Sequence, residues 1–255
     1  YDHSTSVKYS KKYIVPAWLN LAEYPFKSHY LDVEGHQMHY IDEGEGQPIL
    51  FLHDLPLWSF QYRQVIKGLM DQYRCVALDY MGFGLSDKPK NAVYSLTLAR
   101  AQVKALMIHL KIEQAIVVAH GWSVQIAQCL DHWNHTPTYL FLPPSEDAHP
   151  FARGKKFQAH MAVMNPGLLR GLVKDLFEDK QKAKPWLLDQ YILPFKLKQD
   201  RAALKIFLKR GRDMPITMFG DAEGAVPTPY MMSEENPEAL IERILALMPK
   251  ENVEV

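Results

Sequence analysis

The sequence predicts an α/β fold: an N-terminal antiparallel hairpin, a mostly parallel sheet, and a helical insertion that interrupts the sheet. Two observations predict the sheet. Short apolar runs recur along the first half of the chain, and helical patterns separate them. Continuous rather than alternating apolar runs indicate strands that are covered on both faces. Strands that alternate with helices form parallel sheets with right-handed crossovers. A third observation, a long strand-free stretch late in the chain, predicts the insertion.

The elements of the first half follow in order. Tyr30–Val33 and His39–Ile41, joined through Glu34 and Gly35, are typical of a hairpin. Three apolar runs bounded by turn residues then predict buried strands over Pro48–His53, Arg74–Asp79 and Gln114–Ala119. Apolar residues at helical spacing predict the two intervening helices, over Phe60–Gln72 and Leu96–Leu110.

The pattern changes after Thr138–Leu142. From Phe151 to Arg212 the chain has helical signals and no strand signals, and strand patterns then resume. The resumed core comprises a strand, a helix and the opening of another strand, over Pro215–Phe219, Pro237–Met248 and Asn252–Val255. These boundaries predict an N-terminal extension (1–23), a core in two pieces (24–144 and 213–255) and a helical cap (145–212).

Composition narrows the class of protein. The chain has 255 residues, 47% of them apolar and 23% charged, which suits one large α/β domain. No apolar run approaches the ~18 residues of a transmembrane helix, and no secretory leader is recognisable. Cys75 and Cys129 both lie in apolar stretches, which predicts two buried free thiols and an intracellular, reducing compartment such as the cytoplasm or the mitochondrion. We expect no metal site and no cofactor.

The charge is balanced overall but unevenly distributed. Residues 150–214 carry 15 Lys and Arg against 6 Asp and Glu, a local net charge of +9 within a chain whose net charge is zero. Such a basic cap predicts a protein partner or an acidic or anionic surface as its contact. Nucleic acid is not expected, because the balance is neutral and no nucleic-acid-binding module is recognisable.

One segment carries a specific resemblance. Tyr73–Pro89 contains Gly-Phe-Gly-Leu-Ser-Asp-Lys-Pro and resembles the α/β-hydrolase superfamily, most closely the haloalkane dehalogenases. Weaker similarities occur in the family's order, over Met38–Gly44, His53–Ser59, Val118–Trp122 and Tyr191–Phe195. The resemblance implies the α/β-hydrolase fold with a nucleophile on a strained strand-to-helix turn.

The resemblance also assigns positions, and several depart from the family's pattern. The nucleophile position is Gly121, which has no side chain with which to form an ester. Trp122 matches the halide-facing tryptophan, or is a large core aromatic. Leu55 stands where the family supplies a halide-binding Asn. Asp54 replaces a usual Gly, where it would repel an anion or cap the helix that begins near Trp58.

The remaining acid and base positions are also irregular. One location for the family's acid falls near Pro143, and the other falls at Asp221 and Glu223, which are also ordinary turn residues. The family's general-base His lies beyond the last strand, near Val255 where this sequence stops. His120 and His53 are interpreted as structural histidines of a turn or core.

An alternative nucleophile is Ser123, in Gly121-Trp122-Ser123-Val124-Gln125, a near match to Gly-x-Ser-x-Gly. Its other interpretation is a helix cap, since serine is common at helix N-termini.

Three functions therefore compete. The preferred expectation is a catalytically inactive structural or binding component, part of a larger assembly. The second is a hydrolase of small hydrophobic haloalkanes, esters or epoxides. The third is a binder of small apolar ligands in a pocket between core and cap. The residues predicted to line that pocket are His53, Asp54, Leu55, Trp58, His120, Trp122, Pro143 and Phe195.

Overall fold

The computed structural model of the chain describes residues 14–130, 138–142, 165–210 and 231–248. The predicted strands at 215–219 and 252–255 lie outside these ranges. So do Pro143, Asp221, Glu223 and the polar start of the chain. The domain boundaries proposed above remain predictions.

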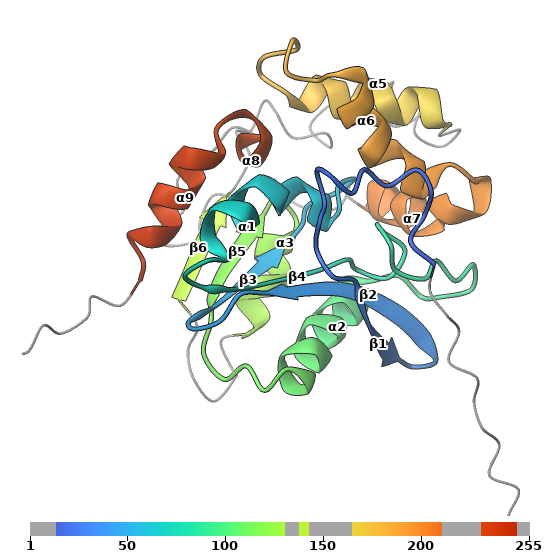
Figure 1. Ribbon diagram of the computed structural model, residues 1–255. Helices are drawn as coiled ribbons and strands as arrows, with labels where there is room; N and C mark the ends of the chain where they lie inside the picture. Colours follow the sequence, from blue (N-terminus) through green and yellow to red (C-terminus); the bar gives the residue numbers. More distant parts are fainter. Residues whose placement is uncertain (1–13, 131–137, 143–164, 211–230, 249–255) are drawn as a thin grey trace, which may run out of the picture.

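A six-stranded mixed sheet forms the centre of the molecule (Figure 1), with strand order β1-β2-β4-β3-β5-β6. The first two strands pair antiparallel and β2 joins β4 antiparallel, whereas β4, β3, β5 and β6 run parallel. The strands are β1 (His29–Val33), β2 (His36–Glu43), β3 (Pro48–Leu52), β4 (Arg74–Leu78), β5 (Ile116–His120) and β6 (Thr138–Leu142). The sequence prediction of a hairpin ahead of a parallel sheet is confirmed.

The hairpin turns where the sequence indicates. Glu34 and Gly35 adopt left-handed backbone angles, with φ of 53° and 82°. Glycine takes up this conformation without steric cost, which is why Glu34-Gly35 can connect two adjacent strands directly.

Helices cover both faces of the sheet. Figure 1 shows α2 on the opposite side of the sheet from α1, and α1 packs against α9. The helices that flank the sheet are η1 (Ser59–Tyr62), α1 (Arg63–Leu69), α2 (Leu96–His109), α3 (Ser123–Ala127), η2 (Gln128–Leu130), α8 (Met232–Glu235) and α9 (Pro237–Leu245). The predicted helix at 60–72 begins as the 3₁₀ turn η1 and continues as α1, which ends at Leu69; the side chain of its N-cap residue Trp58 makes no capping bond.

The described part of the late strand-free stretch is helical, as predicted. Figure 1 shows its helices, in yellow and orange, gathered above the sheet. They are α5 (Pro166–Leu176), α6 (Pro185–Ile192), η3 (Leu193–Phe195), η4 (Lys198–Arg201) and α7 (Ala202–Arg210). Asn165 caps α5, since its side chain accepts a hydrogen bond from the Leu168 amide at 2.9 Å.

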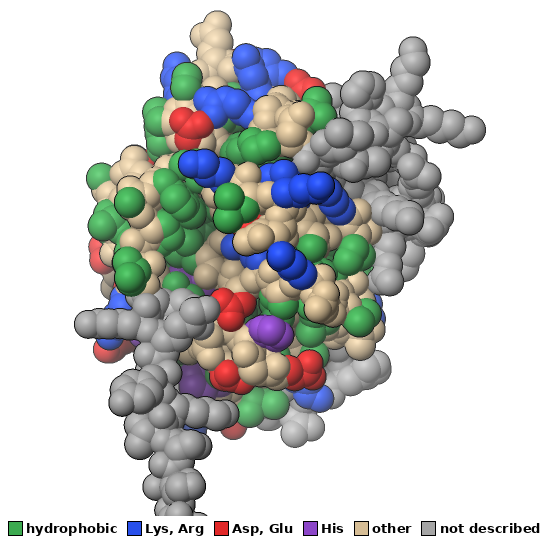
Figure 2. Space-filling model, turned by 90° about the vertical axis from the view of Figure 1, so that its right-hand side faces the viewer, with side chains coloured by type: hydrophobic (Ala, Val, Ile, Leu, Met, Phe, Trp, Pro, Cys, Tyr) green, Lys and Arg blue, Asp and Glu red, His purple; other side chains and the backbone are tan. Residues whose placement is uncertain are grey.

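Basic side chains lie over this helical region, and Figure 2 shows Lys and Arg gathered on the upper part of one face. The partner predicted for the basic cap remains a prediction.

Two further expectations can be compared with the described residues. No helix among them is long and apolar enough to cross a membrane. Cys75 is a buried free thiol, and burial raises its pKa to about 12. The side chain of Cys129 lies outside the described part of the structure.

The register between the parallel strands β3 and β5 determines which residues lie together at the carboxyl ends of the two strands. Leu52 of β3 lies opposite Ala119 of β5. The residues that follow the two strands therefore leave the sheet side by side, so His53 and Asp54 emerge next to His120 and Gly121.

Candidate active site

The turn after β5 has the strand–turn–helix form of a nucleophile elbow. Gly121 follows the strand directly with φ of 56°, and α3 begins two residues later. The Val124 amide donates to the Gly121 carbonyl at 3.1 Å, which closes the first turn of the helix. Gly121 thus occupies the apex of the elbow.

The space above Gly121 is filled by a carboxylate from another loop. A Cβ built on Gly121 would lie 1.9 Å from Asp54 Oδ2 and 2.1 Å from Asp54 Cγ. The Trp122 amide donates to Asp54 Oδ1 at 2.9 Å, and Asp54 is fully buried. The carboxyl group of Asp54 therefore stands where a side chain of residue 121 would project.

The loop after β3 is held in this position by its backbone. The Asp54 amide donates to Gln61 Oε1 at 3.0 Å, and the Asp54 carbonyl accepts from the Leu57 amide at 2.8 Å. The expectation that Asp54 caps the helix near Trp58 is wrong. Its carboxylate instead accepts from the Trp122 amide, because the register of β3 and β5 brings the elbow within reach.

The histidines that end the two strands differ in their surroundings. His53 Nε2 accepts from the Tyr80 amide at 3.1 Å, so its Nδ1 carries the proton that is donated to the Asp54 carbonyl at 3.0 Å. Burial lowers the pKa of His53 to about 4. Both of its nitrogens are engaged, which suits a structural histidine.

His120 lies beside the carboxylate. Its Nδ1 is 3.9 Å from Asp54 Oδ2 and 3.4 Å from Gln61 Nε2. An amide nitrogen can only donate, so the contact with Gln61 fits an Nδ1 that carries a lone pair.

Ser123 is the first residue of α3 and is fully buried. Its hydroxyl donates to the His53 carbonyl, so the Tyr80 hydroxyl, 3.2 Å away, is the donor to Ser123 Oγ. Burial raises the pKa of Tyr80 and keeps that donor protonated. Trp122 is the N-cap residue of α3, and it makes no side-chain capping bond. The expectation of a Ser123 cap is therefore wrong. The Ser123 proton points at a carbonyl rather than at a base, which disfavours Ser123 as a nucleophile.

An aromatic cluster lies over the elbow. The Trp122 ring packs 4.6 Å from Phe207 of α7 and 5.3 Å from Tyr80, measured between ring centroids. Phe83 contacts both Phe207 and Phe195, at 6.0 and 5.8 Å. The helical insertion thus gives this edge of the sheet an apolar cover.

The Trp122 indole N–H is buried, and among the described residues it has no hydrogen-bond acceptor. Most buried donors in native proteins are paired, so such a donor calls for an explanation.

The structure brings together six of the residues predicted to line a pocket. His53, Asp54, Leu55, His120 and Trp122 lie at the two strand ends, and Phe195 joins the aromatic cluster. Trp58 packs on a different set, with Phe60 and Tyr24, and its indole donates to the Gln190 carbonyl at 3.0 Å. Pro143 lies outside the described residues. Sequence reasoning missed Gln61, which binds both the Asp54 amide and His120 and carries no motif of its own.

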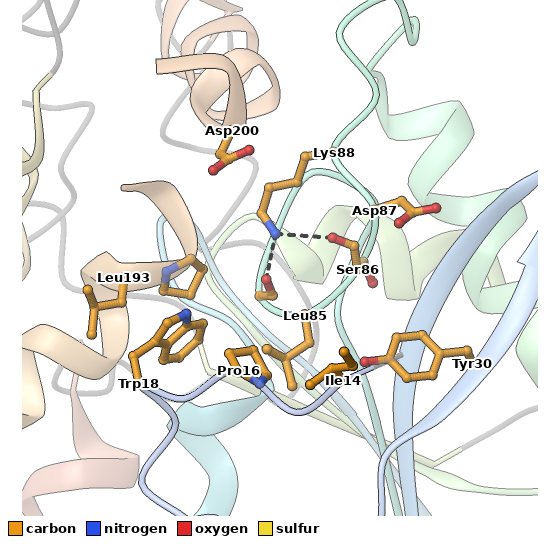
Figure 3. A pocket seen from close by; sticks show the side chains of 12 residues that line it. Ile14, Pro16, Trp18, Tyr30, Leu85, Ser86, Asp87, Lys88, Leu193 and Asp200 are labelled. Carbon is orange, nitrogen blue, oxygen red and sulfur yellow. Dashed lines mark hydrogen bonds between the residues drawn. The ribbon is translucent and has the colours of Figure 1, made fainter. Parts of the chain in front are cut away.

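A cavity of about 350 Å³ lies elsewhere (Figure 3), between the chain near Trp18 and the Gly84–Lys88 turn. Lys88 Nζ donates to the Gly84 carbonyl at 2.6 Å and the Ser86 carbonyl at 3.1 Å, and burial lowers the pKa of its amine to about 8. None of the residues predicted for the ligand pocket lines this cavity.

Within the described ranges no cluster of three or more His, Cys, Asp or Glu could hold a metal ion.

Comparison with known proteins adds three findings. The family profile of the alpha/beta hydrolase fold matches residues 47–127. A haloalkane dehalogenase from Mycobacterium marinum is 32% identical over 207 residues, which cover 74% of this chain and 67% of that protein. A cis-3-alkyl-4-alkyloxetan-2-one decarboxylase from Shewanella oneidensis is 40% identical over 105 residues, 40% of this chain and 33% of that protein.

Among solved structures, a tetrameric haloalkane dehalogenase from Paraglaciecola agarilytica superposes with a TM-score of 0.69 at 20% identity. The match covers 88% of this chain and 93% of that one. This likeness supports the fold. The alignments with the first curated relatives span only about a third of those relatives' length, 33% and 37%.

These relatives are named as enzymes, and they overturn the expectation of a catalytically inactive component of an assembly. The physical reason for the error is local. Gly121 has no side chain, but the space above it is not without a reactive group, because the Asp54 carboxylate occupies it.

Proposed function

Because this chain belongs to the α/β-hydrolase family and is haloalkane dehalogenase-like, we propose that it is a hydrolase of small apolar substrates, with haloalkanes as the first substrate class. The observation that carries the proposal is the Trp122 indole N–H, which is buried at the elbow without an acceptor among the described residues. A departing halide would accept a hydrogen bond from this donor. Donors aimed at developing negative charge typically contribute about 10²–10³-fold to turnover.

The surroundings of the donor support an apolar organic group as the remainder of the substrate. Trp122, Tyr80 and Phe207 pack their rings together at the elbow, and Leu55, which follows Asp54 in the chain, is also buried. Apolar walls with few polar groups are the usual composition of small-molecule sites.

The test is halide release by the purified full-length protein from a series of bromo- and chloroalkanes, with a styrene-type epoxide and a p-nitrophenyl ester as comparison substrates. We expect halide release, and a loss of about 10²-fold in Trp122→Phe, which keeps the ring and removes the N–H. Turnover of the epoxide or ester with no halide release would contradict haloalkanes as the substrate class. No turnover of any of these substrates would contradict the hydrolase proposal itself.

The matched control is Trp186→Phe, since Trp186 is a half-exposed tryptophan of α6. It removes the same N–H from a site away from the elbow and should leave halide release unchanged.

A further inference from the structure

We propose that Asp54 is the nucleophile of this protein, supplied to the elbow from the loop after β3 rather than by the residue at the apex. The proposal rests on the proposed hydrolase function and names the residue that would carry it. Its basis is the overlap between the Asp54 carboxyl group and the space that a side chain of residue 121 would occupy.

The first argument is position. The elbow presents its apex side chain above the carboxyl ends of the strands, where a substrate can meet it. Asp54 Oδ2 and Cγ lie 1.9 and 2.1 Å from the Cβ position of residue 121, so the carboxyl group stands at the root of that side chain. A carboxylate is an established nucleophile for covalent catalysis.

The second argument is orientation. The Trp122 amide holds Asp54 Oδ1 at 2.9 Å, and this bond fixes the plane of the carboxyl group. With Oδ1 held by this donor, Oδ2 is directed toward His120, whose Nδ1 lies 3.9 Å away.

The third argument is reciprocity between the two loops. Gly121 lacks the Cβ that would clash with Asp54, and Asp54 supplies the carboxyl group that Gly121 lacks. Because Leu52 pairs with Ala119, residues 54 and 121 are neighbours across the two parallel strands. A carboxylate at one position therefore requires a glycine at the other.

The proposed reaction has two steps. In the first, Asp54 Oδ2 attacks the carbon that bears the halogen, a carbon–oxygen bond forms, and the halide leaves with the bonding electron pair toward the Trp122 indole. In the second, water adds to Cγ of the alkyl ester and the bond from Cγ to the alkyl-bearing oxygen breaks. The alcohol departs with one proton of the water and with an oxygen that belonged to Asp54.

The other proton of the water passes to His120 and then to solvent. His120 Nδ1 is the imidazole nitrogen 3.9 Å from Asp54 Oδ2, and to take the proton its lone pair exchanges the Gln61 donor, 3.4 Å away, for the water. This assignment revises the structural role expected for His120 from its sequence position. The sum is haloalkane and water converted to alcohol, halide and a proton.

The experiment exposes the full-length protein to a bromoalkane in water enriched in the heavy isotope of oxygen, followed by digestion and mass mapping of the peptides. We expect the heavy oxygen, or the alkyl group, on Asp54. Asp54→Asn, which keeps the shape and the acceptor for the Trp122 amide, should lose about 10⁴-fold or more in halide release. The control Asp32→Asn removes an exposed carboxylate and should change nothing.

The outcomes separate this proposal from the proposed function. Halide release with neither label on Asp54, or an Asp54→Asn variant with undiminished activity, would overturn the nucleophile and leave the hydrolase standing. Alkylation of Asp54 without release of alcohol would support the nucleophile and contradict turnover. Absence of both halide release and labelling would overturn both.

Discussion

The loop after β3 and the turn after β5 begin alike and then diverge. Each begins at a histidine at the end of a buried strand, since His53 follows β3 directly and His120 is the last residue of β5, and the two strands are parallel neighbours in the sheet. After His53 the chain places Asp54, which points across to the other loop, and after His120 it places Gly121, which leaves room for it. The comparison shows that two loops share the space at this edge of the sheet. A reactive group in that space can therefore come from either loop.

After substitution of Asp54 itself, the largest effect is expected from the histidine that faces its carboxylate. His120→Gln should lower kcat for halide release by about 10²–10⁴-fold, because a general base contributes on that order. His53→Gln should affect the stability of the fold far more than the chemistry, since both nitrogens of His53 are bound to backbone. Steady-state kinetics beside urea denaturation distinguishes the two, and equal kinetic losses would contradict the division of roles.

Because the Asp54 carboxylate fills the space above Gly121, any side chain at position 121 should lower the stability of the protein strongly. Gly121→Ala should destabilise the protein by about 3 kcal/mol, because the new Cβ meets the Asp54 carboxylate and must also adopt a left-handed φ. Gly35→Ala is the matched control. Gly35 has φ of 82° and no atom within 4 Å of its Cβ position, so only the backbone strain of about 1 kcal/mol remains. Equal unfolding midpoints for the two variants would contradict the crowding at Gly121.

Acid should destabilise the fold through His53. Its pKa is about 4 in the folded protein and 6.5 when unperturbed, so below pH 6.5 the unfolded chain binds a proton that the folded chain does not. Stability should therefore fall by about 3 kcal/mol as pH drops from 6.5 to 4, and His53 adds no further loss below that. Urea unfolding across this range checks the slope.

His53→Gln should remove this part of the pH dependence. Asp79, whose carboxylate accepts from His39 Nδ1, has a lowered pKa, so its stabilising effect is lost only as pH falls below the ordinary aspartate range. A variant that keeps the full wild-type slope between pH 6.5 and 4 would show that another group is responsible.

Much of this arrangement could be predicted from the sequence, and the part that could not has a clear physical cause. Apolar runs and turn glycines locate β3, β4, β5 and the hairpin, because burial and positive φ are local demands on residue type. The apex at Gly121 follows from the resemblance to the α/β-hydrolases, which assigns the nucleophile position to that residue. The position of the Asp54 carboxylate above Gly121 depends on the register between β3 and β5. That register cannot be predicted from the sequence of either strand alone. Two apolar strand runs that each lead into a histidine, with Asp after one histidine and Gly after the other, are the signal that could have revealed it.

The smallest effect is expected at Ser123. Ser123→Ala should cost about 2 kcal/mol of stability, because the bonds to the His53 carbonyl and to the Tyr80 hydroxyl are both lost, and should change halide release by less than about threefold. Loss of all activity would restore Ser123 as a candidate nucleophile and would place the chemistry at the first residue of α3.

The most direct measurement is an exchange of the two residues, in the variant Asp54→Gly with Gly121→Asp. Each single change should abolish halide release, since one removes the carboxylate and the other forces two carboxyl groups into one space. The double variant should regain both stability and halide release, because the carboxylate returns to the same volume from the neighbouring loop. A double variant that folds with wild-type stability and releases no more halide than Asp54→Gly alone would contradict the account.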